Sequence, residues 1–132
     1  LVEWHVDGQV LRPPEMEGRW MVHDGLVMAT RHRNGPKDFE STAGYGAYRW
    51  GPMTWTYGYE RSEDLHGLSA EDVDLTVTES HPIEMSTFQI TRDGDMLILD
   101  GERLRWEYDI PGETFLLTTS SGRPIRKYRK IR

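Results

Sequence analysis

The stretch that decides the fold is GYGAYRWGPMTWTYGYE, residues 44–60. Successive side chains of a β-strand point to opposite faces of the sheet. Before the Gly51-Pro52 turn, Tyr48 and Trp50 therefore share one strand face. After the turn, the next strand presents three aromatic residues on one face, namely Trp55, Tyr57 and Tyr59. Aromatic residues at every second position on both sides of a Gly-Pro turn predict a β-hairpin.

The same alternation continues through most of the chain. Apolar residues of segment 104–110 alternate with charged ones, so one face is expected to be buried and the other wet. Asp-Gly, Gly-Pro, Pro-Gly and Ser-Gly pairs recur between such segments and favour tight turns. We expect strands at 1–6, 19–23, 26–32, 45–50, 53–60, 73–79, 83–91, 96–100, 102–110, 113–119 and 125–131.

Two segments are expected to interrupt this pattern. Residues 61–72 predict a short helical turn, and residues 33–42 a longer loop. A sheet of about eight to ten strands in 132 residues would leave exposed edges unless it closed on itself. The sequence therefore predicts an all-β fold, with residues 1–132 forming one antiparallel up-and-down β-barrel. A two-layer sandwich is the alternative.

Composition and charge exclude several classes of protein. The chain has no Cys, so disulfides, thiolate chemistry and Cys-type metal sites are excluded. No apolar run approaches the length of a membrane span, and no signal peptide is visible, so a cytoplasmic location is expected. The net charge of −6 argues against a nucleic-acid partner. Residues 123–132 hold six basic and no acidic residues, which predicts a charged edge or seam strand, or else an anion contact.

The aromatic hairpin resembles the corresponding part of small bacterial lipocalin-like (calycin-type) domains. The later segment 88–99, FQITRDGDMLIL, resembles the same family's hairpin of two apolar strands around a Gly-Asp turn. Gly18-Arg19-Trp20 is similar to the G-x-W pattern of lipocalins, in which the Trp closes one barrel end against an Arg near the C-terminus. Arg126 or Arg129 would be that partner, with Trp4 as a rival for the Trp. The resemblance implies a barrel that binds an apolar small molecule; a minority of such folds are cofactor-free cyclases or isomerases.

The aromatic side chains are the candidate ligand-binding residues, because flat rings with hydroxyl and indole donors suit an aromatic or apolar organic molecule. The alternative is that they form only the barrel core. The candidate wall consists of Tyr48, Trp50, Trp55, Tyr57, Tyr59, Met28, Trp106 and Tyr108. We expect a small-molecule ligand or substrate as the partner of a monomer or homodimer, with no nucleic acid and no membrane involved.

An enzyme on the same barrel is the alternative function. His32 alternates with Met28 and Thr30, so an inward-facing row would bring its imidazole into the cavity as an acid or base. Tyr57 is the second candidate catalytic residue. Such an enzyme would be a cyclase or isomerase without a cofactor. The five His residues show no metal-site spacing, and no nucleophile elbow or phosphate-binding loop is present.

Overall fold

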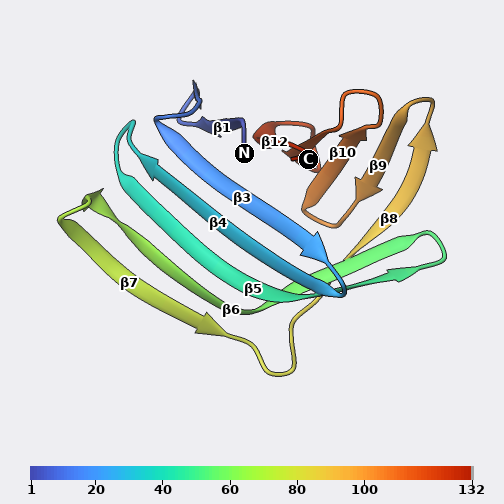
Figure 1. Ribbon diagram of the computed structural model, residues 1–132, viewed down its shortest axis with the longest axis horizontal. Helices are drawn as coiled ribbons and strands as arrows, with labels where there is room; N and C mark the ends of the chain where they lie inside the picture. Colours follow the sequence, from blue (N-terminus) through green and yellow to red (C-terminus); the bar gives the residue numbers. More distant parts are fainter. Residues whose placement is uncertain (132) are drawn as a thin grey trace.

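The computed structural model describes residues 1–131, and all of its regular elements are β-strands. Strands and connecting turns alternate along the whole described chain (Figure 1). The twelve strands are β1 (Glu3–Val6), β2 (Gln9–Leu11), β3 (Met16–His23), β4 (Leu26–Asn34), β5 (Phe39–Gly51), β6 (Thr54–Ser69), β7 (Asp72–Glu79), β8 (Ser86–Asp93), β9 (Met96–Asp100), β10 (Leu104–Asp109), β11 (Thr114–Thr119) and β12 (Pro124–Arg129).

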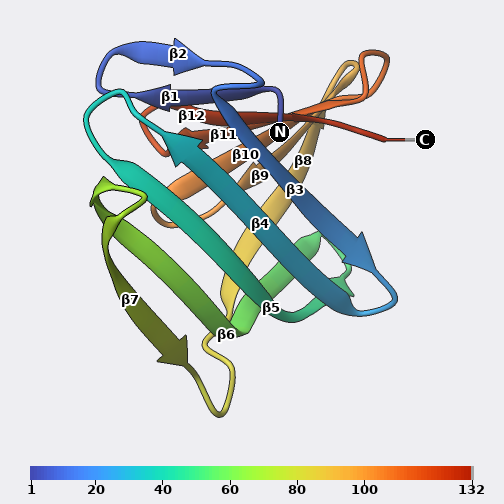
Figure 2. The same cartoon turned by 60° about the vertical axis from the view of Figure 1, so that its left-hand side comes forward.

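All twelve strands belong to one antiparallel sheet that curls into a nearly closed barrel. The order is β2-β1-β12-β11-β10-β9-β8-β6-β5-β4-β3, and β7 pairs with β6 outside this path. Most neighbours are consecutive in the chain, as an up-and-down topology requires. The wall of β3 to β7 curves opposite the wall of β8 to β12, and the β1–β2 hairpin lies near the start of β3 (Figures 1 and 2). The predicted all-β, up-and-down barrel is confirmed.

The long strand β6 divides between two partners. Its first part pairs with β8 from Thr54 to Tyr57, and its later part pairs with β7 from Arg61 to Ser69. The predicted helical turn at 61–72 is therefore wrong. Polar residues occupy both faces there and hide the strand period, but the segment pairs with β5 on one side and β7 on the other.

Two further expectations need correction. The predicted loop at 33–42 is reduced to residues 35–38, because β4 extends to Asn34 and β5 begins at Phe39, directly opposite it. Of the two positions expected for the basic last strand, an edge is excluded, since β12 pairs with both β1 and β11. The short strand β2 (Gln9–Leu11) lies outside every expected segment, and the structure has twelve strands instead of eight to ten.

The seam between β3 and β1 closes through the start of the chain. The amino group of Leu1 donates to the carbonyl oxygen of Gly18 at 3.0 Å, and the next amide, of Val2, donates to the carbonyl oxygen of Lys127 at 2.8 Å. The first two residues thus link β3 to β12.

We call the side of the sheet that carries the aromatic core the inner face, and the other side the outer face.

The core lies between the two walls. Its fully packed members are Trp55, Phe88, Leu99, Trp106, Leu117 and Tyr128, each at most 8% exposed. A smaller cluster at one end of the barrel consists of Trp4, Leu11 and Met16. Since aromatic side chains bury large areas, this core accounts for much of the stability of a chain with 36% hydrophobic residues. Among residues 1–131 there is no helix that could cross a membrane.

A register shift between Tyr45 and Gly46 lets β5 and β6 bend, and it brings two backbones unusually close. A Cβ at Gly46 would overlap the carbonyl oxygen of Gly58 in the facing strand. Gly44, two residues earlier on the same strand, has more room, because a Cβ there would lie 3.2 Å or more from its neighbours.

We therefore expect Gly46→Ala to lower the free energy of unfolding by about 2 kcal/mol or more, because the clash involves backbone on both sides. The matched control Gly44→Ala should change it by less than about 1 kcal/mol. Urea denaturation followed by near-UV circular dichroism measures both. Equal effects of the two substitutions would contradict the close approach of β5 and β6.

Candidate functional site

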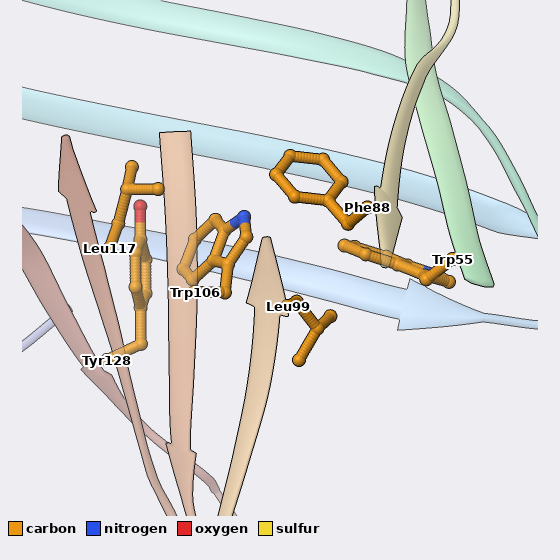
Figure 3. Packing of buried hydrophobic residues seen from close by; sticks show 6 residues of the cluster. All are labelled: Trp55, Phe88, Leu99, Trp106, Leu117 and Tyr128. Atoms are coloured by element: carbon orange, nitrogen blue, oxygen red, sulfur yellow. The ribbon is translucent and has the colours of Figure 1, made fainter. Parts of the chain in front are cut away.

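The inner face is paved with aromatic rings that bridge the two walls. Trp20 of β3 stacks on Trp106 of β10, with ring centroids 4.7 Å apart and planes inclined by 5°. Trp20 also meets Trp55 edge-on at 5.6 Å and Phe115 at 6.0 Å. Tyr128, Trp106 and Phe88 project from the β8–β12 wall toward β3 and β4 (Figure 3). A flat, rigid surface therefore lines this half of the barrel interior.

Seven of the predicted wall residues lie on this inner face. A continuous chain of ring contacts runs along β5 and β6 through Trp50, Tyr48, Trp55, Tyr57 and Tyr59. On the opposite wall, Phe115 contacts both Trp106 and Tyr108. Trp50 is 62% exposed at the end of the row, whereas Trp55 is 2% exposed. Most of these rings pack against one another, so they serve as core as well as lining.

Met28 and His32 lie on the outer face instead. Trp20 pairs with Ala29 across β3 and β4, so Ala29 shares the inner face and its neighbour Met28 points outward, 50% exposed. His32 follows at the same parity and packs edge-on against Phe39 at 5.1 Å. The expectation that His32 enters the cavity is therefore wrong. At the start of segment 26–33, both alternating rows of side chains are apolar. The sequence alone therefore does not show which row faces inward.

Met28 and His32 instead help to line an open hollow of about 770 Å³ along β3, β4 and β5. Its other outward-facing side chains include Arg19, Met21 and Thr30. None of the inner aromatic residues lines this hollow, although Arg31 of the inner face is among its lining residues. The predicted site residues therefore divide between an aromatic interior and a separate outer groove.

The Trp that meets an Arg near the C-terminus is Trp4, the rival of Trp20. The guanidinium of Arg126 lies over the Trp4 ring at 5.8 Å, and that of Arg33 at 5.3 Å. Trp4 is 4% exposed, so two cations cover a buried indole. This arrangement closes one end of the barrel.

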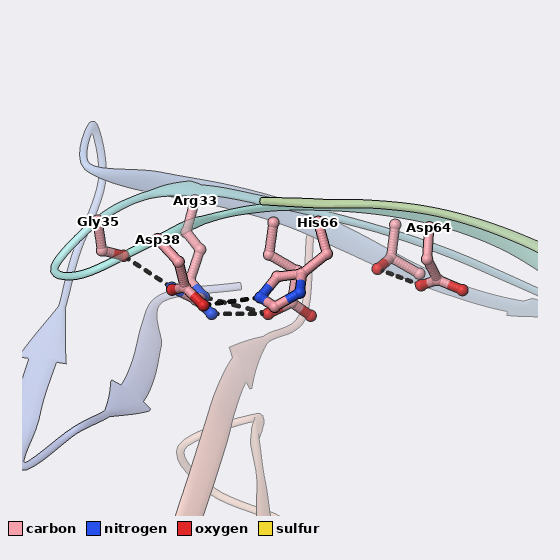
Figure 4. Close-up of polar contacts among 7 residues, drawn as sticks. Arg33, Gly35, Asp38, Asp64 and His66 are labelled. Carbon is pink, nitrogen blue, oxygen red and sulfur yellow. Dashed lines mark hydrogen bonds and ion pairs between the residues drawn. The ribbon is translucent and has the colours of Figure 1, made fainter. Parts of the chain in front are cut away.

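Arg33 is held by a complete set of acceptors at that end. Its Nη1 lies 2.6 Å from Asp38 and 2.9 Å from the carbonyl oxygen of Gly35, and its Nη2 lies 2.9 Å from Glu40 (Figure 4). His66 Nε2 lies 2.7 Å from the second oxygen of Asp38. Hydrogen bonds from Arg33 and His66 hold the pKa of Asp38 below its ordinary value. The network fastens the β4–β5 turn to β6.

Arg31 and Arg126 contrast with Arg33. Both lie on the inner face, because Arg31 is two residues from Arg33 on β4 and Arg126 is two residues from Tyr128 on β12. The Nε atom of each is buried without a hydrogen-bond partner. Within residues 1–131, neither guanidinium lies within ion-pair distance of a carboxylate. Two half-buried cations are thus left without counter-ions.

Two indole N–H groups of the aromatic surface are unpaired as well. Trp55 Nε1 is buried and has no hydrogen-bond partner, and Trp106 Nε1 is buried and forms no hydrogen bond of good geometry, although the Tyr57 hydroxyl lies beside it. Most buried donors in proteins find an acceptor, so such groups require an explanation. Together with Arg31 and Arg126, the inner face carries four buried donors that form no hydrogen bond of good geometry, with the Tyr57 hydroxyl beside Trp106 and the Tyr128 hydroxyl beside Arg126.

The tyrosine hydroxyls beside these donors stay protonated. Burial raises the pKa of Tyr59 to about 12, with the neighbouring Tyr57 adding to the effect and Arg31 opposing it. Burial also raises the pKa of Tyr57, against the opposing influence of the nearby Trp106 indole, Arg126 and Arg31. Both hydroxyls can donate hydrogen bonds at neutral pH, and neither is a ready base.

Sequence reasoning missed Arg31 as part of this interior, and it named Trp20 and Arg126 only as the expected closure of one barrel end. The available signal was parity: Arg126 alternates in phase with Tyr128, and Arg31 with Ala29 and Val27. Because charged side chains are ordinarily assigned to solvent, the row of β4 that contains Arg31 was predicted to face outward.

Replacing Tyr59 by Phe tests the buried hydroxyl. Because the pKa of Tyr59 is raised in the folded state, its stabilising contribution is complete below about pH 10 and is lost as the pH rises toward 12. Between pH 9 and pH 11, the parent protein should lose about 1 kcal/mol more unfolding free energy than the Tyr59→Phe variant. Urea denaturation at the two pH values measures this difference. The Tyr45→Phe variant, at an exposed position, is the control. If Tyr59→Phe lost as much unfolding free energy as the parent between the two pH values, the burial of the Tyr59 hydroxyl would be refuted.

Comparison with known proteins finds no family model, no characterised protein and no solved structure that matches the chain. The fold is that of a nearly closed antiparallel barrel, which is compatible with a lipocalin-like architecture.

Proposed function

We propose that this protein is a lipocalin-like barrel that binds a small organic molecule with an aromatic or apolar body on its inner face. The observation that carries the proposal is the set of four buried donors that form no hydrogen bond of good geometry, on Arg31, Arg126, Trp55 and Trp106. A bound molecule with acceptor oxygens would pair with these groups. The adjoining rings would cover its body.

The unpaired groups destabilise the protein when no ligand is bound. Leaving a buried donor unsatisfied costs about 1–3 kcal/mol, whereas pairing it with an acceptor recovers that cost. The stack of Trp20 and Trp106 provides a flat surface next to these donors, on which an aromatic ring gains stacking contacts. An interior built only for stability would have paired these groups or replaced them by apolar side chains.

Binding is favoured over catalysis by the placement of the acid–base candidates. His32 faces away from the aromatic interior, beside Phe39. Burial keeps the hydroxyl of Tyr57 protonated, which suits a hydrogen-bond donor to a ligand and not a general base. The interior therefore offers recognition groups, and we propose storage, transport or sensing of a ligand ahead of the cyclase or isomerase alternative.

The test uses 2-naphthamide, an uncharged aromatic probe whose carbonyl oxygen is an acceptor. We expect saturable binding with one site per chain by isothermal titration calorimetry. Trp106→Phe keeps a ring but removes the indole N–H, and it should weaken binding by about 3-fold to 10-fold. The matched control Trp50→Phe, at the exposed end of the row, should leave affinity unchanged.

A Met28→Glu variant separates the interior from the outer groove. Binding that survives Trp106→Phe unchanged but is lost in Met28→Glu would place the probe in the outer groove and contradict the proposal. Absence of binding up to the solubility limit of the probe would also contradict it.

A further inference from the structure

We infer that the ligand of the inner face is an organic anion, whose negatively charged oxygen group lies between Arg31 and Arg126. The inference rests on the proposed function and deepens it, because it names the chemical class of the ligand.

The three inward arginines differ in one respect. Arg33 reaches two carboxylates and a carbonyl oxygen, so its charge is balanced inside the protein. Arg31 and Arg126 have buried Nε atoms with no partner. Glu40, the acid whose charge acts on Arg126, is already hydrogen-bonded to Arg33 through both Nε and Nη2. Arg126 lies over the Trp4 ring and beside the Tyr128 hydroxyl, neither of which is a carboxylate. Within residues 1–131 no carboxylate forms an ion pair with Arg31 or Arg126, so a bound anion would supply the counter-ion.

The closure of the barrel brings these two arginines toward each other. Arg31 pairs with Gly18, whose carbonyl oxygen accepts the hydrogen bond from the Leu1 amino group. The next residue, Val2, is bonded to Lys127, the neighbour of Arg126. One hydrogen-bonded path thus runs across the seam from Arg31 to Arg126.

The electrostatics agree with this proximity. Burial and the positive charge of Arg31 both lower the pKa of Arg126. Both guanidiniums also act on the hydroxyl of Tyr57. Two like charges that approach each other in a half-buried space repel, and an anion between them would convert this repulsion into attraction on both sides.

The surroundings define what the anion must look like. A guanidinium matches the planar geometry of a carboxylate and donates charge-assisted hydrogen bonds to it. The aromatic rings begin next to the cations, since Arg126 neighbours Leu117 across β11 and Tyr128 follows two residues later. A carboxylate or sulfonate attached to an aromatic or apolar body fits this sequence of charge and ring. A polymer such as nucleic acid does not, because the cations face the interior.

The experiment compares 2-naphthoate with 2-naphthamide, which differ in the charge of one group. We expect the naphthoate to bind at least about 10-fold more tightly at pH 7, in line with the strength of charge-assisted hydrogen bonds. Arg31→Met and Arg126→Met should each reduce this preference to about 3-fold or less. Calorimetric titration of both probes into each variant gives the ratio directly.

The matched control is Arg105→Met. Arg105 lies on the opposite face of β10 from Trp106, and its Nη2 is 3.1 Å from Glu107. Its Nε atom forms no hydrogen bond, like those of Arg31 and Arg126, but lies 3.9 Å from Asp100 Oδ1, so the variant removes a buried guanidinium that already has counter-ions outside the proposed site. The preference for naphthoate should persist in this variant.

A second readout separates binding from a structural role. If Arg31 stabilised the fold, its removal would lower the stability of the protein. Removal of a cation that has no counter-ion and is repelled by Arg126 would not lower it. We expect Arg31→Met to raise the melting temperature of the ligand-free protein by about 2–4 °C, and naphthoate to raise that of the parent more than that of the variant.

Equal affinity for naphthoate and naphthamide would overturn the anion inference while leaving the proposed function intact. Failure of both probes to bind would overturn both. A preference for naphthoate that survives both Arg31→Met and Arg126→Met would place the anion elsewhere and overturn the inference. A lower melting temperature in Arg31→Met would give Arg31 a structural role and also overturn it.

Discussion

The stack of Trp20 on Trp106 is the interaction on which the rest of the structure depends. The two indoles come from opposite walls, and within residues 1–131 backbone pairing joins those walls at the β6–β8 junction and through the first residues of the chain. An aromatic pair contributes about 0.5–1.5 kcal/mol beyond the area that it buries. Its greater consequence is geometric, because it determines which row of β3 faces inward.

The charge of the interior follows from that choice. With Trp20 inward, its partner Ala29 is inward as well, and the alternation of β4 then directs Arg31 and Arg33 into the barrel. On β12 the same rule places Arg126 beside Tyr128. One end of the interior is thus aromatic and the other cationic. Within residues 1–131, carboxylates form ion pairs with Arg33 but not with Arg31 or Arg126, which is the kind of local inconsistency that proteins retain at functional sites.

Much of the fold could be predicted from local pattern. The hairpin turns were evident, and Asp24 and Gly25 adopt the positive φ angles of +50° and +81° that their turn requires. Segment 104–109 was assigned to the correct faces, because its apolar and charged residues separate cleanly. Segment 61–69 was not recognised as a strand, since its two faces are both polar and its structure depends on pairing with β5 and β7.

Only part of the site could be predicted, because the remainder depends on pairing between strands that are distant in the sequence. The aromatic rows around the Gly51-Pro52 turn were apparent, and the structure places them on the inner face. The phase of β4 was misassigned because Leu26 and Met28 are as apolar as Val27 and Ala29. Only the pairing of Trp20 with Ala29 across strands resolves the choice, and such long-range pairing is not written in either segment alone.

The central claim is that the inner face, with its unpaired donors, receives an organic anion. The most direct measurement is a ¹H–¹⁵N NMR titration that follows the five indole N–H resonances and the arginine Nε–H resonances as 2-naphthoate is added. The account predicts that the largest shifts belong to Trp55, Trp106, Arg31 and Arg126, while Trp50 and Arg105 change little. Shifts confined to the backbone amides of the outer groove, with the inner indoles unmoved, would contradict it.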